Sequence, residues 1–169
     1  FPDYKGGAAP KLKRVIVRHV TEAAAQRLLL EKGDVDVASD LNPDQIQAIA
    51  GKPELKVVQI PRGTVYYLAL NTANPNLAKP EVWQAMHWLI DYDGIANQLF
   101  RGQYKVNQTP LGSGTVGALT DKPYKLDVAK AKSLLAKAGF PDGFSISIDV
   151  MSASPYREIS QSIQSTFAQ

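Results

Sequence analysis

The sequence predicts an α/β fold, in which segments suited to strands take turns with segments suited to helices. Residues 12–20 and 144–151 alternate apolar and polar positions, as strands do. Residues 79–91 and 127–139 repeat apolar positions at helical spacing. The chain has 169 residues and 44% hydrophobic content, so it can bury a core, and its length suits one domain or two small ones.

The first third reads as strand, helix and strand. Residues 12–20 (LKRVIVRHV) predict a strand, and the following helix has Thr21 as a candidate cap and Gly33 as its end. Residues 34–39 (DVDVAS) predict a second strand. Such a unit within about thirty residues is a βαβ crossover, so we expect the two strands to be parallel.

A second helix and strand lead to a bend. Asn42 is placed to cap a helix that has Pro43 in its first turn and Gly51 at its end, and residues 54–60 predict a strand. Residues 61–63 (PRG) then interrupt the extended run, because proline cannot donate to a ladder and glycine tolerates unusual dihedrals. This bend is a candidate crossing between two domains.

Residues 64–71 predict a strand with two unlike faces. The face better suited to a core carries Thr64, Tyr66, Leu68 and Leu70. The opposite face carries Val65, Tyr67, Ala69 and Asn71. The second face combines small residues with one phenol and one amide, so a ligand could approach its backbone closely.

Two helices and a long loop follow. Pro80 begins a helix over 79–91, and Asp93 is a candidate cap for a short helix that Gly102 would end. Residues 103–126 show no periodicity and contain several glycines and prolines. A loop of this length is usually functional or packed over another element.

The last elements predict helix, strand and helix. Asp127 caps a helix that Gly139 ends, residues 144–151 predict a strand, and residues 154–169 predict a final helix. A further strand would be expected after that helix. The chain also opens on Phe1 rather than on methionine, so we expect a fragment of a longer protein.

The composition disfavours several function classes. The net charge is only +3 and the cations are dispersed, which disfavours nucleic-acid binding. Without cysteine there is neither a disulfide framework nor a thiolate metal site, and His19 and His87 lack the spacing of a ligand pair. No G-x-S-x-G elbow occurs, and the GSG at 112–114 has the wrong context for a phosphate loop. We therefore expect no metal, no cofactor and no catalytic residue, although a fragment could lack its catalytic half.

Six collinear motifs resemble a known family, the extracytoplasmic solute-binding proteins of peptide, dipeptide and nickel ABC transporters (family 5). They are FPDYKGGAAPKLKRVIVRHV, RLLLEKGDVDVAS, YYLALNTANP, VWQAMHWLIDYDGIANQLFRG, DVAKAKSLLAKAGFPDGF and SPYREISQSIQSTFAQ. The resemblance covers essentially the whole chain. Trp83 stands where the family usually has arginine, which leaves the apolar stripes intact.

The resemblance implies a middle fragment of a bilobate, periplasmic-binding-protein-like fold of class II, in its large three-subdomain form. Residues 1–61 would end lobe one, residues 62–169 would begin lobe two, and Pro61, Arg62 and Gly63 would form the hinge. Such proteins enclose an oligopeptide or dipeptide between lobes that close by hinge motion, and deliver it to the membrane permease. A periplasmic monomer is implied, or a lipid-anchored protein outside a Gram-positive cell.

The resemblance also implies a ligand-lining role for Val65, Tyr67, Ala69 and Asn71, because the corresponding strand borders the ligand cleft. Tyr67 is the first choice for a direct contact. The competing interpretation packs Tyr67 at the base of the lobe with its hydroxyl on a backbone carbonyl. The competing function is an α/β transferase or hydrolase whose catalytic residues lie outside this segment.

Overall fold

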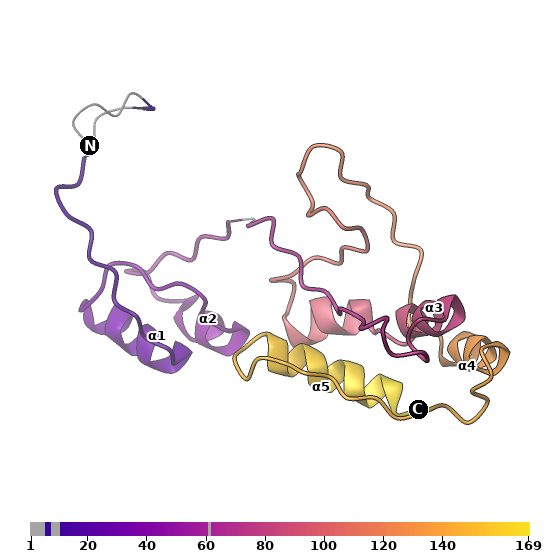
Figure 1. The fold of residues 1–169 in the computed structure, drawn as a ribbon. Coiled ribbons are helices and arrows are strands. Elements are labelled where there is room, and N and C mark those ends of the chain that lie inside the picture. Colours follow the sequence, from indigo (N-terminus) through magenta and orange to yellow (C-terminus); the bar gives the residue numbers. More distant parts are fainter. Residues whose placement is uncertain (1–5, 8–10, 61) are drawn as a thin grey trace. The chain divides into compact units, whose positions relative to one another are not determined.

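The computed structural model describes residues 6–7, 11–60 and 62–169, and the chain divides into two compact units, Phe1–Leu41 and Asn42–Gln169. Figure 1 labels its α-helices and draws the π-helix η1 without a label. In chain order they are α1 (Ala23–Lys32), α2 (Pro43–Ile49), α3 (Pro80–Trp88), the π-helix η1 (Gly94–Leu99), α4 (Val128–Lys137) and α5 (Tyr156–Phe167). No helix of the described residues is long and apolar enough to cross a membrane.

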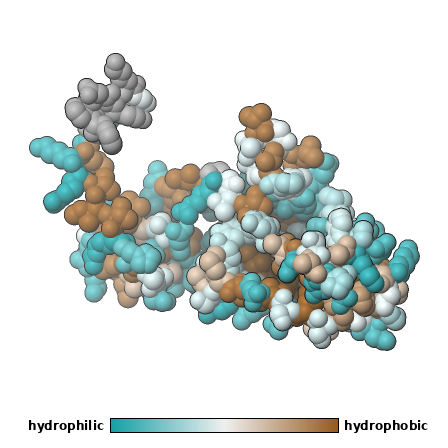
Figure 2. Space-filling model, in the orientation of Figure 1, coloured by the Kyte–Doolittle hydropathy of each residue, from teal (hydrophilic) through white to brown (hydrophobic). Residues whose placement is uncertain are grey.

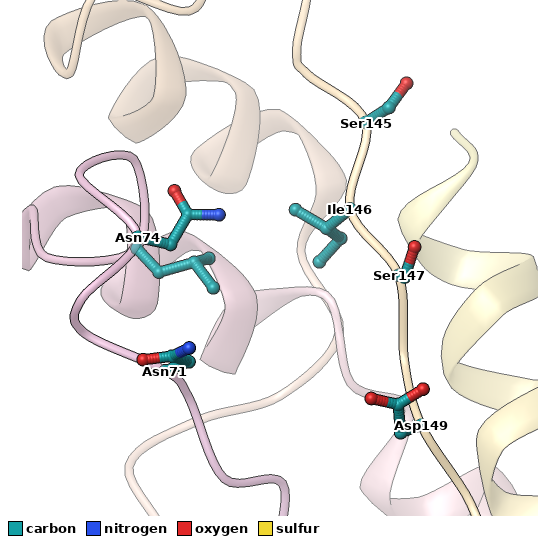
Figure 3. Close-up of a pocket in the computed structure, with 7 residues that line it drawn as sticks. Asn71, Asn74, Ser145, Ile146, Ser147 and Asp149 are labelled. Atoms are coloured by element: carbon teal, nitrogen blue, oxygen red, sulfur yellow. The ribbon is translucent and has the colours of Figure 1, made fainter.

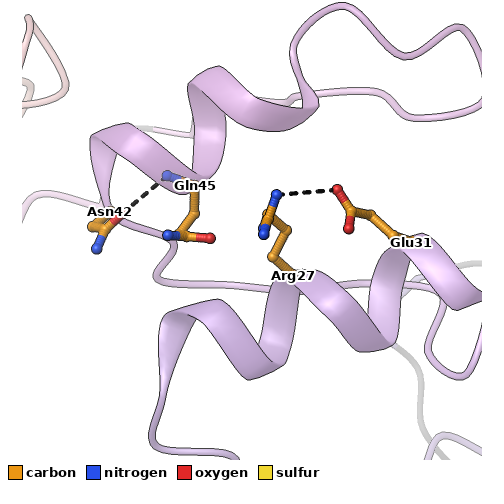
Figure 4. Close-up of polar contacts among 4 residues, drawn as sticks. All are labelled: Arg27, Glu31, Asn42 and Gln45. Atoms are coloured by element: carbon orange, nitrogen blue, oxygen red, sulfur yellow. Dashed lines mark hydrogen bonds and ion pairs between the residues drawn. The ribbon is translucent and has the colours of Figure 1, made fainter.

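The first unit contains α1. The sequence correctly predicted the residue that ends this helix but not the one that caps its beginning. Gly33 ends the helix as expected, with a left-handed φ of 76°. Thr21 does not cap it: the helix begins after Glu22, without a side-chain cap. Gln26 instead donates from Nε2 to the Val20 carbonyl over 2.8 Å. The Arg27–Glu31 ion pair, 3.4 Å long, follows the helix surface (Figure 4).

The second unit begins with α2. Asn42 caps it as expected, because its Oδ1 accepts from the Gln45 N–H at 3.0 Å (Figure 4). Pro43 occupies the first turn, where a missing N–H costs nothing. Arg101, which directly follows η1 and Phe100, reaches back to α2, where it pairs with Asp44 at 2.9 Å and donates to the Gln47 side chain.

The core of the second unit lies between α3 and α4. One buried cluster joins Ala85 and Leu89 to Ala131 of α4, and the small side chains of the two alanines let the two helices approach closely. A second cluster contains Leu77, Val82, Met86 and Ala138. A polar link joins the pair: Lys79, at the start of α3, donates from Nζ to the Ala138 carbonyl at the end of α4 over 2.7 Å. At its own beginning α4 is capped by Asp127, which accepts from the Lys130 N–H at 2.9 Å.

The π-helix η1 and α5 complete the second unit. Asp91, rather than the predicted Asp93, caps η1: its Oδ1 accepts from the Gly94 N–H at 2.9 Å, and Asp93 makes no capping bond. The helical turn begins at Tyr92, so Asp91 stands at the ordinary capping position, three residues before the N–H from which it accepts. The amphipathic helix α5 buries Ile163, as the predicted apolar face requires.

The five predicted strands do not appear as strands in the described part of the chain. Residues 12–20, 34–39, 54–60, 64–71 and 144–151 run as coil, and the backbone hydrogen bonds of the described residues join no two of them. A strand needs a neighbour about 4.8 Å away to bond to, whereas a helix bonds within itself. In the first unit Val17 is 90% exposed, within a stretch that Figure 2 colours as hydrophobic. The helical half of the α/β prediction is therefore confirmed, and its sheet stays a prediction.

Candidate functional site

Residues 64–71 keep the two-faced pattern although they form no ladder. Leu68 and Leu70 pack on the cluster around Leu77, and Tyr66 lies edge-on against Tyr104 and Tyr156, with ring centroids 5.5 and 5.4 Å apart. On the opposite face Tyr67, Ala69 and Asn71 are exposed, Tyr67 to 83%, and Val65 is half-buried. The expected core face is thus packed, apart from the exposed Thr64 at its start.

Residues 144–149 show the same alternation. Phe144 and Ile146 are half-buried against the Leu77 cluster, while Ser145, Ser147 and Asp149 are exposed. Two coil segments that are far apart in the sequence therefore rest on one hydrophobic cluster. Each turns its polar side chains outward.

A cavity of about 480 Å³ lies between these two stretches. It is lined by Asn71, Asn74, Leu77, Ser145, Ile146, Ser147 and Asp149 (Figure 3). Leu77 and Ile146 make it partly apolar, and the remaining groups are polar. At roughly 3.3 Å per residue, 4.8 Å between strands and 10 Å between layers, an extended residue needs roughly 160 Å³, so the cavity matches about three residues.

The polar groups of the cavity supply both donors and acceptors. Asn71 Oδ1 accepts from the Ala73 N–H at 3.1 Å, and Asn74 Oδ1 accepts from the Asn76 N–H at 3.0 Å. Both carboxamide oxygens are thus held in turns, which leaves the Nδ2 groups as the donors that a ligand could meet. Asp149 contributes a carboxylate and the serines two hydroxyls. Such a set can bind an amide, or a carbonyl at one end and an ammonium at the other.

The predicted site residues are only partly brought together. Of the four ligand-lining candidates, Asn71 lines the cavity, while Tyr67 and Ala69 lie on the exposed face before it and Val65 is half-buried. Of the hinge candidates, Arg62 and Gly63 are exposed, and Pro61 lies outside the described residues. These assignments stay predictions. Sequence reasoning missed the six other lining residues, although the alternation of 144–151 marked the second wall.

His87 belongs to an aromatic cluster away from the cavity lining. Its ring stacks on Tyr124, with centroids 4.5 Å apart and planes 13° apart, and its Nδ1 lies 3.4 Å from the Tyr92 hydroxyl. Burial lowers the pKa of His87. Burial, and then Coulombic interaction with Tyr124, raises the pKa of Tyr92 to about 12. Both groups are therefore neutral near pH 7, as the interpretation of His87 as a half-buried packing residue requires.

His19 is exposed. The residues that the structure describes contain no group of three or more His, Cys, Asp or Glu side chains placed to hold a metal ion.

Comparison with known proteins gives one consistent result. The sequence model of bacterial extracellular solute-binding proteins, family 5 Middle, matches residues 1–169. The D,D-dipeptide-binding periplasmic protein DdpA of Escherichia coli, named as probable, is 35% identical over 133 residues, which are 78% of this chain and 26% of that protein. The glutathione-binding protein GsiB of Pectobacterium atrosepticum is 26% identical over 148 residues, 88% of this chain and 29% of that protein.

A solved structure is similar over almost the same range. The periplasmic binding protein DppA of Helicobacter pylori, associated with an ABC transporter and in complex with the peptide STSA, matches with a TM-score of 0.81 and 25% identity. The match covers 89% of this chain and 30% of that one. The chain therefore spans less than a third of the length of each of these three proteins.

Proposed function

Since the chain belongs to the bacterial extracellular solute-binding proteins of family 5, we propose that its protein captures a peptide or a similar small solute for an ABC importer. The match of the family model to residues 1–169 carries this proposal. Two names add support, because one relative is called dipeptide-binding and the solved neighbour holds a peptide.

The proposed mechanism is enclosure between two lobes. Residues 1–61 end the first lobe of a bilobate α/β fold, residues 62–169 begin the second, and Pro61, Arg62 and Gly63 form the hinge between them. Closing the lobes removes the solute from water, and the closed form is what the permease subunits recognise. The protein works as a monomer in the periplasm, or anchored by lipid outside the cell, and performs no catalysis.

The exposed face of residues 65–71 and the adjoining cavity form the proposed solute-binding surface on this part of the protein. Tyr67 offers a large, rigid aromatic surface that is already exposed, so contact with a ligand needs little rearrangement. Asn71 and Asn74 offer donors to a peptide carbonyl, and Asp149 offers an acceptor to an ammonium or amide. Peptide recognition through main-chain hydrogen bonds suits an extended ligand in such a cavity.

Calorimetric titration of the protein produced from its complete gene tests the proposal. The ligands are the peptide STSA, D-alanyl-D-alanine and glutathione, since the names of the neighbour and relatives point to these classes. We expect at least one to bind, and Asn71→Ala to weaken it about tenfold by removing one hydrogen bond from an enclosed ligand. Asn97→Ala, on exposed η1 surface outside the cavity, is the matched control.

Two outcomes would each contradict one part of the proposal. Binding of none of the three ligands would contradict the proposed class of solute. Binding that survives unchanged in Asn71→Ala, Tyr67→Ala and Tyr67→Phe would keep the class and remove this surface from the ligand site. It would favour the alternative in which Tyr67 serves the packing of the fold.

A further inference from the structure

The long loop 103–126 is closed upon itself near both ends. Gln108 forms two hydrogen bonds with the backbone of Tyr124: its Nε2 donates to the carbonyl at 2.8 Å, and its Oε1 accepts from the N–H at 2.9 Å. Farther along, Thr109 Oγ1 lies 3.3 Å from the Leu119 carbonyl. Asn107 Nδ2 donates to the Thr109 carbonyl at 2.6 Å. These bonds make the loop one folded piece, which its lack of periodicity did not reveal.

The base of this loop is fixed to α3. Tyr124 stacks on His87 and lies edge-on to Trp88, with ring centroids 5.3 Å apart. A few residues on, the Asp127 N–H donates to the Trp88 carbonyl at 2.8 Å. A loop attached in this way moves with the α3 and α4 core.

The far part of the loop meets the bend after residue 61. Gly112 is buried, and a Cβ placed on it would overlap the carbonyl oxygen of Gly63 and lie 3.1 Å from its carbonyl carbon. The contact is peculiar to this glycine: a Cβ on Gly114 or Gly117 would meet nothing within 4 Å. Gly63 itself has a φ of 67°, a conformation that other residues seldom adopt. Two glycine backbones therefore touch where the chain turns.

We propose that loop 103–126 is a brace that fixes the backbone at Gly63 through the contact with Gly112. The α3 and α4 core, acting through Tyr124 and Gln108, thereby sets the direction in which the chain leaves the bend. A rotation at Gly63 must carry the loop with it or break the contact. The brace is inferred from the contacts of the loop alone. Its importance for solute capture rests on the proposed function, in which the bend is a hinge.

Backbone ¹⁵N relaxation of the protein produced from its complete gene, without any solute, tests the brace. In Gly112→Ala the new methyl group pushes the loop off Gly63, so the order parameters of the Thr64 and Val65 amides should fall from about 0.85 to below about 0.6, while those of α3 and α4 stay unchanged. Gln108→Ala should lower the same order parameters by freeing the base of the loop. Gly51→Ala is the control, since its Cβ would meet nothing within 4 Å.

Two results would overturn the brace. Unchanged order parameters at Thr64 and Val65 in a folded Gly112→Ala protein would overturn the brace. If Gly112→Ala fails to fold, Gln108→Ala decides, and unchanged order parameters there overturn the proposal equally. Because no solute is present, this result is independent of solute binding, and a failed titration with STSA would leave the brace intact.

Discussion

The α3–α4 pair and the two coil segments at 64–71 and 144–151 share one hydrophobic cluster but differ in how they are built. Each helix forms its backbone hydrogen bonds internally and adds a cap or a side-chain link at its end, such as Asp127 on α4. The coil segments contribute apolar side chains to the same cluster, yet among the described residues their backbones bond to no neighbouring strand. Local bonding can be completed within a short segment, whereas a sheet needs a partner.

The largest expected effect on stability comes from the difference in burial between the helical core and the coil segments. Met86 in α3 is 7% exposed and Met151 at the end of the second coil segment is 58% exposed. We expect Met86→Ala to lower the free energy of unfolding by about 2–5 kcal/mol, through lost contacts and a cavity. Met151→Ala should change it by less than about 0.5 kcal/mol. Urea unfolding followed by circular dichroism measures both. Equal losses would mean that the coil segment is packed as firmly as the helix.

A smaller effect tests whether caps stabilise the helical region. Asp127→Ala removes the acceptor for the Lys130 N–H and should cost about 1 kcal/mol of unfolding free energy. Asp93→Ala is the matched control, because Asp93 makes no capping bond in η1. Thermal unfolding of the two variants side by side gives the comparison. If they lose the same stability, the cap geometry of α4 is not what stabilises its first turn.

The smallest effect is a pH dependence centred on His87. Since burial holds its folded pKa below the ordinary 6.5, the unfolded chain takes up the proton first, and stability falls as the pH drops below about 6.5. Among the described residues, its ring stacks on Tyr124, and its Nδ1 lies 3.4 Å from the Tyr92 hydroxyl, whose raised pKa of about 12 keeps it neutral in this range. His87→Phe keeps the stacking, so unfolding midpoints at pH 7.5 and 5.5 should differ less for it than for the natural chain. A variant with the same pH dependence would place the titrating group elsewhere.

The sequence predicted features that depend on local bonds better than features that need a distant partner. Asn42, Asp127, Gly33 and Gly139 mark helix ends through bonds or dihedrals of the local chain, and each behaves as predicted. Asp91 was missed because the helical turn begins at Tyr92, before the start that the sequence suggested. The apolar alternation of 64–71 correctly indicated that Tyr66, Leu68 and Leu70 pack inward, but Thr64, assigned to the same face, is exposed. The alternation could not indicate a pairing partner.

The candidate site, too, was predicted only as far as a single segment of the chain reveals it. Asn71 was identified from the polar face of its own segment, but the cavity also needs Ser145, Ser147 and Asp149, which lie more than seventy residues later. Only packing on a common cluster brings those walls together. Likewise, Gly112 looked like one flexible glycine among several, because close contact with a distant backbone leaves no sign in the local sequence.

The Arg101–Asp44 pair ties a residue before the bend to one well after it, within the second compact unit. Its side chains are 51% and 73% exposed, so the attraction acts largely through water and dissolved ions weaken it. A rotation at the proposed hinge would change the distance between these two side chains. Such a rotation should therefore become easier at high salt concentration than in dilute buffer.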